Sequence, residues 1–254
     1  MDKVLLVTGG ARGIGAATAR LAAGEGYAVA VNYRERADEA RKVVDAIEAA
    51  GGRALAVQAD VGDEADIVRM FDEVEEQLGR LTHLVNNAGI NGGPPGPVLE
   101  FDAAALERLM RVNVVGLMLC CREAVKRMST ARGGRGGAIV NVSSMAATIG
   151  GRAGRSAYAA SKGAVDSFTT GLAREVAGQG IRVNVLRPGM TRSPMTAPVH
   201  DDPTRLAAVR ASIPMGRTAE AEEMARPILF LLSEAASFVA GAHLNVSGGG
   251  YRIE

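Results

Sequence analysis

The chain has 254 residues, 47% of them apolar, and its formal net charge at pH 7 is +1. A charge this close to zero provides no field of one sign, which excludes nucleic acid and membrane surfaces as electrostatically attracted partners. No apolar stretch approaches the roughly 20 residues that a membrane-spanning helix requires. Because residues 4–7 already have the pattern of a strand, we also expect no signal peptide before the fold.

Strand-like and helix-like segments alternate along the chain. Short apolar runs predict strands at residues 4–7, 28–32, 54–59, 84–86, 138–142, 183–186 and 244–246. The stretches between them predict helices at residues 14–24, 36–50, 64–78, 103–128, 157–177 and 220–233. This alternation predicts one α/β domain over residues 1–254, with a mostly parallel seven-stranded sheet covered by helices on both faces.

A glycine-rich turn, Thr8 to Gly15, follows the first predicted strand and opens the first helix. Gly9 lets the chain turn sharply, Gly13 lets the backbone approach a pyrophosphate, and Gly15 lets the helix pack closely on the sheet. The helix N-terminus offers N–H groups and the positive end of its dipole to the phosphates. The turn therefore predicts a dinucleotide site that also includes Ala11, Arg12 and Ile14.

The end of the second predicted strand bears on the choice of cofactor. It carries Asn32, Tyr33 and Arg34, where an NAD-binding protein usually places an acid on the ribose 2′-hydroxyl. No carboxylate at these three positions repels a 2′-phosphate, and Arg34 or Arg12 can pair with it. We therefore favour NADP over NAD. The alternative is that both arginines are solvated and that either cofactor is accepted.

Tyr158 and Lys162 lie at positions i and i+4, which places a phenol and an ammonium on one helix face. A nearby cation stabilises the phenolate and lowers the phenol pKa from about 10. The alternative is an amphipathic helix with a buried tyrosine and a surface lysine. Ser144 follows the strand at 138–142, at the sheet edge where ligands of open α/β sheets bind. Asn113 lies within an apolar helix, where either a structural or a catalytic hydrogen bond accounts for its amide.

Over nearly its full length, the chain resembles the short-chain dehydrogenase/reductase family, including its carbonyl and 3-oxoacyl reductases and its sugar dehydrogenases. The resemblance lies in a series of motifs, in order and with family-like spacing. They are Thr8 to Gly15, Asp60-Val61, Asn86 to Gly89, Asn113, Ser143-Ser144, Tyr158 to Lys162, Pro188-Gly189 and Ser247 to Gly249. The resemblance implies a Rossmann-type, doubly wound sheet and assembly into homodimers or homotetramers.

The resemblance also implies a catalytic set of Asn113, Ser144, Tyr158 and Lys162. Tyr158 would act as general acid and base. Lys162 would lower its pKa and hold the nicotinamide ribose. Ser144 would orient the substrate oxygen, and Asn113 would hold a water in a proton relay. Because Ser143 stands beside Ser144 and the segment to Tyr158 is one residue longer than is common in the family, the choice between these serines stays open.

Further cofactor contacts are implied along the chain. Asp60 and Val61 would flank the adenine, Asn87 would contact the ribose with Ala88 and Gly89 beside it, and Pro188 and Gly189 would line the nicotinamide. The family's usual threonine position after this turn holds Ser193, and Thr191 stands two residues earlier. Either hydroxyl can therefore contact the carboxamide of the nicotinamide.

The predicted function is hydride transfer between a nicotinamide and a small ketone, aldehyde, alcohol or sugar-like substrate. Three loops, at residues 91–98, 145–156 and 191–213, are expected to shape the substrate pocket, the last as a mobile lid without regular structure before Thr204. Arg152 and Arg155 in the second loop either orient an anionic substrate or are solvated. The alternatives are a 3-oxoacyl-thioester reductase and a non-catalytic NADP-sensing protein.

Two further expectations concern partners and location. His83, His200 and His243 are scattered without Cys or carboxylate at ligand spacing, so no metal site is expected. Cys120 and Cys121 are adjacent in an apolar helical stretch, where neighbouring side chains point in different directions and do not pair. Unpaired cysteines favour a reducing, cytoplasmic location.

Overall fold

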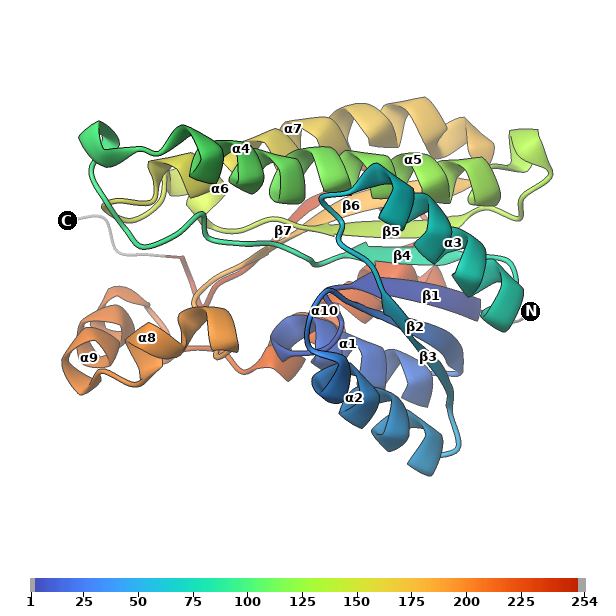
Figure 1. Ribbon diagram of the computed structural model, residues 1–254, viewed down its shortest axis with the longest axis horizontal. Coiled ribbons are helices and arrows are strands. Elements are labelled where there is room, and N and C mark those ends of the chain that lie inside the picture. The colour runs from blue at the N-terminus through green and yellow to red at the C-terminus, as the bar shows by residue number, and fades with distance from the viewer. Residues whose placement is uncertain (1–2, 251–254) are drawn as a thin grey trace.

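The computed structural model describes residues 3–250, which form three layers with a sheet in the middle (Figure 1). Within this range seven parallel strands pair in the order β3-β2-β1-β4-β5-β6-β7. The strand order reverses between β1 and β4, which creates a crevice at their carboxyl ends. The strands are β1 (Lys3–Thr8), β2 (Tyr27–Tyr33), β3 (Arg53–Gln58), β4 (His83–Asn86), β5 (Gly137–Val142), β6 (Ile181–Pro188) and β7 (His243–Val246).

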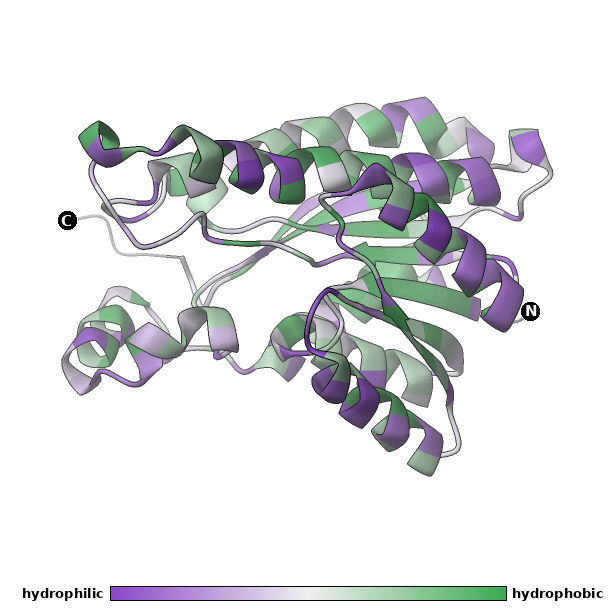
Figure 2. Cartoon of the chain, viewed as in Figure 1, coloured by the Kyte–Doolittle hydropathy of each residue, from purple (hydrophilic) through white to green (hydrophobic). Residues whose placement is uncertain are grey.

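Helices cover both faces of this sheet, which confirms the predicted doubly wound fold (Figure 1). One face carries α1 (Gly13–Gly24), α2 (Ala37–Ala49) and α10 (Ala221–Leu232). The other carries α3 (Glu64–Leu78), α4 (Ala103–Met110), α5 (Leu117–Met128) and α7 (Ser156–Val176). Each face buries its own apolar cluster, with Leu6 and Ile139 in one and Leu5 and Val140 in the other. The strands are therefore apolar on both sides. Figure 2 shows them mostly in the green of hydrophobic residues.

The helix expected over residues 103–128 is interrupted. Between α4 and α5 the backbone forms a π-helical segment, Arg111–Gly116, with Asn113 inside it. Gly116 is needed there because a Cβ at this position would collide with the carbonyl oxygen of Val61. Single π turns inside α-helices are often found at functional sites.

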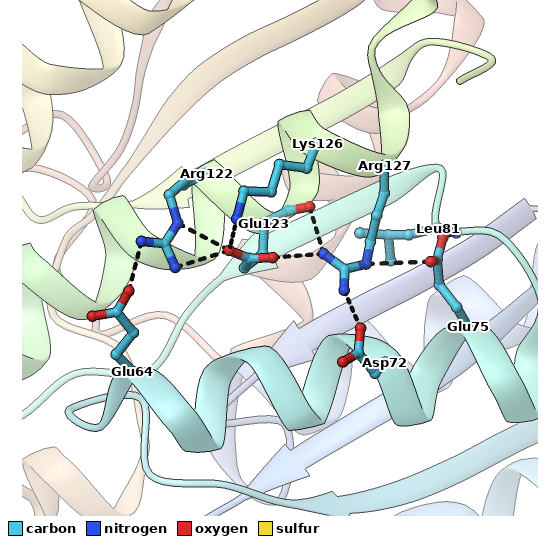
Figure 3. Close-up of polar contacts among 8 residues, drawn as sticks. All are labelled: Glu64, Asp72, Glu75, Leu81, Arg122, Glu123, Lys126 and Arg127. Carbon is cyan, nitrogen blue, oxygen red and sulfur yellow. Dashed lines mark hydrogen bonds and ion pairs between the residues drawn. The ribbon is translucent and has the colours of Figure 1, made fainter. Parts of the chain in front are cut away.

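A network of ion pairs joins α5 to α3 (Figure 3). Glu123 is only 2% exposed, and its carboxylate accepts hydrogen bonds from Arg122, Lys126 and Arg127 at 2.9, 2.8 and 2.7 Å. Although burial alone raises the pKa of Glu123, these three cations hold it below its usual value. Arg127 also pairs with Glu75 at 3.3 Å, which fixes the position of α5 against α3.

The segment expected to form an irregular lid is largely helical. It contains the turn η5 (Pro194–Thr196), α8 (Ala197–His200) and α9 (Pro203–Ser212). The carboxylate of Asp202 caps α9 by accepting hydrogen bonds from two backbone N–H groups, both at 3.0 Å. The short helix α6 (Ala146–Ile149) lies in the second predicted substrate loop. These elements surround the carboxyl ends of the strands.

Candidate active site

A cavity of about 690 Å³ opens at the carboxyl ends of the strands, where the strand order reverses. This is large enough for a dinucleotide and part of a substrate. Of the residues predicted to form the site, only Gly15 and Asn113 do not line it. Those that do are Gly9, Ala11, Arg12, Gly13, Ile14, Asn32, Tyr33, Arg34, Asp60, Val61, Asn87, Ala88, Gly89, Ser144, Tyr158, Lys162, Pro188, Gly189, Thr191 and Ser193.

The turn before α1 has the geometry of a phosphate site. Gly13 adopts a φ of 53°, a conformation that side chains other than glycine rarely tolerate. Arg12 precedes the helix without capping it, and the first turn carries no acidic side chain, so the N–H groups and the dipole face the cavity. Gly15 instead lets α1 pack closely against the turn, because a Cβ at this position would collide with the carbonyl oxygen of Gly9.

Thr8 and Asn87 hold this turn against the end of β4. The Thr8 hydroxyl accepts hydrogen bonds from the backbone N–H groups of Asn87 and Ala88, at 3.0 and 3.1 Å. The Asn87 amide nitrogen donates to the carbonyl oxygens of Thr8 and Gly9, both at 3.0 Å. The phosphate turn and the turn after β4 therefore form one rigid unit.

Two predicted cofactor residues are engaged by the protein itself. Asn32 is 2% exposed, and its amide nitrogen donates to the carbonyl oxygen of Ala59 at 3.0 Å while its oxygen accepts from Gly9 N–H at 3.0 Å. Its side chain therefore joins three strand ends. The Asp60 carboxylate accepts from Arg108 at 2.6 Å. Sequence reasoning missed Arg108, because its partner is 48 residues away and nothing local marks the pair.

Three arginines line the end of the cavity where the adenine is expected. Arg12 and Arg34 were predicted there, and Arg36 joins them in the lining. All three are exposed, and Arg34 pairs with Glu35 at 2.5 Å. Sequence reasoning overlooked Arg36, although it follows Arg34 by two residues. A phosphate on this side of a dinucleotide would meet guanidinium groups from the phosphate turn and from the segment after β2.

Tyr158 and Lys162 project from one face of α7 into the same cavity. The Lys162 side chain is 4% exposed, its Nζ lies 5.8 Å from the centre of the Tyr158 ring, and it donates a hydrogen bond to the carbonyl oxygen of Val142 at 2.9 Å. Burial lowers the pKa of Lys162 to about 8, while the Asp166 carboxylate acts in the opposite direction. The alternative of a surface lysine is therefore wrong.

The structure distinguishes the two adjacent serines. Ser143 is 3% exposed and donates its hydroxyl to the carbonyl oxygen of Lys162 at 3.1 Å, which ties α7 to the end of β5. Ser144 is half-buried, and its oxygen accepts from the backbone N–H of Ala146 at 3.1 Å. That bond does not use the Ser144 proton, so this hydroxyl can donate to a substrate oxygen.

The side chain of Asn113 is engaged with the turn after β4. Its oxygen accepts from Ile90 N–H at 2.8 Å, and its nitrogen donates to the Ile90 carbonyl at 2.9 Å and to the Ser161 hydroxyl at 3.1 Å. These bonds satisfy a 1%-exposed amide inside an apolar helix. Of the two alternatives left open by the sequence, this geometry favours the structural hydrogen bond.

The loops near the substrate end are braced against one another. Arg155 donates to the carbonyl oxygens of Asn91 and Gly93, at 3.2 and 2.6 Å, and so holds the first loop to the second. In the third segment, Thr191 is 3% exposed and donates its hydroxyl to the carbonyl of Gly189 at 3.2 Å. Ser193 instead lies opposite the phosphate turn. A Cβ added to Gly13 would lie 3.1 Å from the Cβ of Ser193.

The hydrogen-bond donors and cations that line the cavity fit a nicotinamide dinucleotide. The cavity combines an uncapped helix N-terminus, arginines at one end and a buried ammonium beside a phenol at the other. Within residues 3–250 no three His, Cys, Asp or Glu side chains are gathered in a way that could hold a metal ion. No helix in that range has the length and apolar character needed to cross a bilayer.

Sequence comparisons relate the chain to known oxidoreductases. A sequence profile described as enoyl-(acyl carrier protein) reductase matches residues 9–251. The chain is 49% identical to the uncharacterized oxidoreductase YgfF of Escherichia coli (strain K12), covering 97% of this chain and 99% of that one. It is 43% identical to cis-4-hydroxycyclohexanecarboxylate dehydrogenase of Sinomonas cyclohexanicum, covering 98% and 96%. It is also 39% identical to the 3-oxoacyl-[acyl-carrier-protein] reductase of Homo sapiens, covering 98% of each.

Solved structures are similar over almost the whole chain. A short chain dehydrogenase from Burkholderia cenocepacia J2315 in complex with NADP has a TM-score of 0.89 and 36% identity, covering 98% of this chain and 97% of that one. A dehydrogenase/reductase from Sinorhizobium meliloti 1021 has a TM-score of 0.90 and 38% identity, covering 98% and 96%.

Proposed function

Because the chain belongs to the short-chain dehydrogenase/reductase family and is an NAD(P)-dependent oxidoreductase of carbonyl and alcohol groups, we propose that Tyr158, Lys162 and Ser144 form its reacting centre. The observation that carries the proposal is the pair on α7. A phenol and a buried ammonium, one helical turn apart, line one cavity beside the phosphate turn.

Each side chain has a distinct part in this proposal. The bound nicotinamide supplies or accepts the hydride. Tyr158 donates its phenolic proton to the substrate oxygen during reduction and takes it back during oxidation. Lys162 favours the phenolate by its charge, and Ser144 donates its hydroxyl to the same substrate oxygen. Asn113 acts by joining the π segment to the turn after β4, so that its effect on the reaction is indirect.

Replacing Tyr158 tests the reacting centre. Tyr158→Phe removes the phenolic hydroxyl and with it the transferable proton, so we expect kcat to fall on the order of 10²- to 10⁴-fold, while NADPH still binds. Stopped-assay turnover and a fluorescence titration with NADPH measure the two effects. Tyr27→Phe is the matched control. Tyr27 lies at the amino end of β2, away from the cavity, and its hydroxyl is buried without a hydrogen-bond partner. Near-normal turnover in Tyr158→Phe would contradict the proposal.

We propose that NADP is preferred over NAD. Arg12, Arg34 and Arg36 at the adenine end support this preference, as does the NADP bound to the Burkholderia cenocepacia relative. The expected result is a lower KM for NADP than for NAD, with the difference reduced in Arg34→Gln, because a guanidinium–phosphate pair is lost. Steady-state kinetics with both cofactors measure it. An equal or lower KM for NAD would refute the preference.

The substrates are proposed to be small ketones, aldehydes or secondary alcohols. The Sinomonas cyclohexanicum relative, whose name specifies a ring alcohol, supports this class. A 3-oxoacyl thioester is the second candidate, supported by the relatives named as 3-oxoacyl-[acyl-carrier-protein] reductases. A non-catalytic NADP sensor is disfavoured because Asn113, Ser144, Tyr158 and Lys162 are all present. Absorbance loss of NADPH across a panel of ketones, aldehydes and thioesters distinguishes the three functions.

Assembly and location are also proposals. We expect a homodimer or homotetramer formed through the long helices, as the family resemblance implies, and analytical sedimentation that finds only monomer would refute it. The thiols of Cys120 and Cys121 are both buried and free, which supports a reducing, cytoplasmic environment.

A further inference from the structure

A second cavity, of about 420 Å³, adjoins the substrate end of the first. The two cavities share Ile149, Arg152 and Val199 in their linings. The second lies between the end of α6 and the helices α8 and α9, and is completed by Arg205, Ala208, Val209 and Ser212. A substrate that has its reacting oxygen at Ser144 and Tyr158 and is long enough to pass Ile149 would enter this second cavity.

The second cavity has a definite chemical character. Ile149, Val199 and Val209 provide apolar walls. Its charged lining consists of Arg152 and Arg205, without a carboxylate among the described lining residues. Such a lining suits a small apolar body that ends in an anion.

The arginines in this region differ in which of the two cavities they line. Arg205 pairs through its Nε with the Asp202 carboxylate at 3.1 Å, and its side chain is 68% exposed. Arg155 donates to loop carbonyl groups, as described above. Arg152 is the one that lines both cavities, which places it between the reacting centre and the far end of a substrate.

We propose that the second cavity binds a carboxylate at the far end of the substrate, with Arg152 as the specificity-determining residue and Arg205 as a supporting cation. The substrate class is then a small, mainly apolar hydroxy or oxo acid. This inference rests on the proposed function, because it needs the reacting oxygen to lie at Ser144 and Tyr158. A guanidinium can bind both carboxylate oxygens at once, which gives direction as well as affinity.

A pair of ketones tests the inference. 4-Oxocyclohexanecarboxylate carries the charge, and 4-methylcyclohexanone has a similar body without it. We expect the enzyme to favour the acid in kcat/KM, and Arg152→Gln to lower the acid-to-neutral ratio roughly tenfold, mainly through KM for the acid. Arg205→Gln should lower the ratio less. Arg210→Gln is the matched control, since Arg210 lies exposed on α9 outside both linings and its loss should leave the ratio as it is.

The outcomes separate the inference from the function on which it rests. Equal kcat/KM values for the two ketones, or an Arg152→Gln variant with an unaltered ratio, would overturn the carboxylate site and leave the reacting centre standing. If neither these ketones nor the broader panel is reduced with either cofactor, the proposed function itself fails. Because the Arg152 side chain is exposed, we expect Arg152→Gln to melt at the same temperature as the wild type. That result would exclude misfolding of the variant.

Discussion

Lys162 shows how a single residue proposed for the reacting centre can lower the stability of the fold. Its side chain is buried, and burial lowers its pKa from the usual 10.5 to about 8. At pH 7 the ammonium form is present in both the folded and the unfolded chain, so the full cost of burying the charge opposes folding. This cost is about 3 kcal/mol. It is relieved as the pH rises from 8 towards 10.5, because the folded protein then releases its proton first.

Lys162→Met is therefore expected to stabilise the protein without cofactor at pH 7 while removing turnover. Loss of the hydrogen bond to Val142 offsets about 1 kcal/mol, which leaves a net gain of about 2 kcal/mol. Urea unfolding at pH 7 and near pH 10 measures the difference between the two proteins. The gain should shrink at the higher pH. A variant that is less stable than wild type at pH 7 would contradict the buried-charge account.

Asn32 and Asn113 show that residue type alone does not reveal the hydrogen-bond partners of a side chain. The sequence indicated that Asn32 and Asn113 belong to the site region, but it left the partners of their amides unknown. Both amides bond to backbone groups, which lie 23 to 27 residues away for Asn32 and 23 residues away for Asn113. No local pattern in the sequence encodes such a contact, because each depends on which distant segments the fold brings together.

At the scale of elements, a buried ion pair connects α7 to the strand beside it. Asp166, one turn after Lys162 on α7, accepts a hydrogen bond from Nε of Arg187 on β6 at 2.9 Å, and the Nη2 of Arg187 forms an ion pair with the same carboxylate oxygen at 2.7 Å. Their side chains are 10% and 17% exposed. Arg187 directly precedes Pro188 and Gly189 in the cavity lining. The pair therefore aligns α7 with the turn after β6, which lines the cavity.

Asp166→Asn should destabilise the protein by about 3 to 5 kcal/mol, because it leaves a buried guanidinium without its counter-charge. Replacing both residues, Asp166→Leu with Arg187→Met, removes the uncompensated charge and should recover most of that stability. Chemical denaturation of the three proteins measures both effects. If the double variant is as unstable as the single one, packing rather than charge accounts for the loss.

Apolar periodicity in the sequence located some of the helices and strands but not others. The strands and most helices were placed within a few residues, because apolar periodicity is a local property. The π segment at Arg111–Gly116 was not predicted, since the apolar residues on either side continue the pattern of a plain helix. The helices α8 and α9 lie where the sequence indicated a loop, because α9 buries only Val209 and so shows little periodicity.

At the scale of the whole molecule, the site combines parts from both halves of the sheet. The glycine-rich turn lies between β1 and α1, the side chains proposed to react follow β5 or lie on α7, and the helices α8 and α9 follow β6 (Figure 1). All of them meet at the carboxyl edge because every strand in the described range runs in the same direction. The parallel sheet thus brings residues that are more than 100 positions apart, such as Gly13 and Ser193, to the same cavity.

The order of strands and helices, the phosphate turn and the face shared by Tyr158 and Lys162 followed from the sequence by itself, because each depends on residues a few positions apart. Only the tertiary structure decided that Asn32 and Asn113 bond to the backbone, that Arg155 braces a loop, and that Arg152 lies between two cavities. The physical reason is that hydrogen-bond partners and cavity walls are set by which segments the sheet brings together. That juxtaposition exists only once the chain has folded.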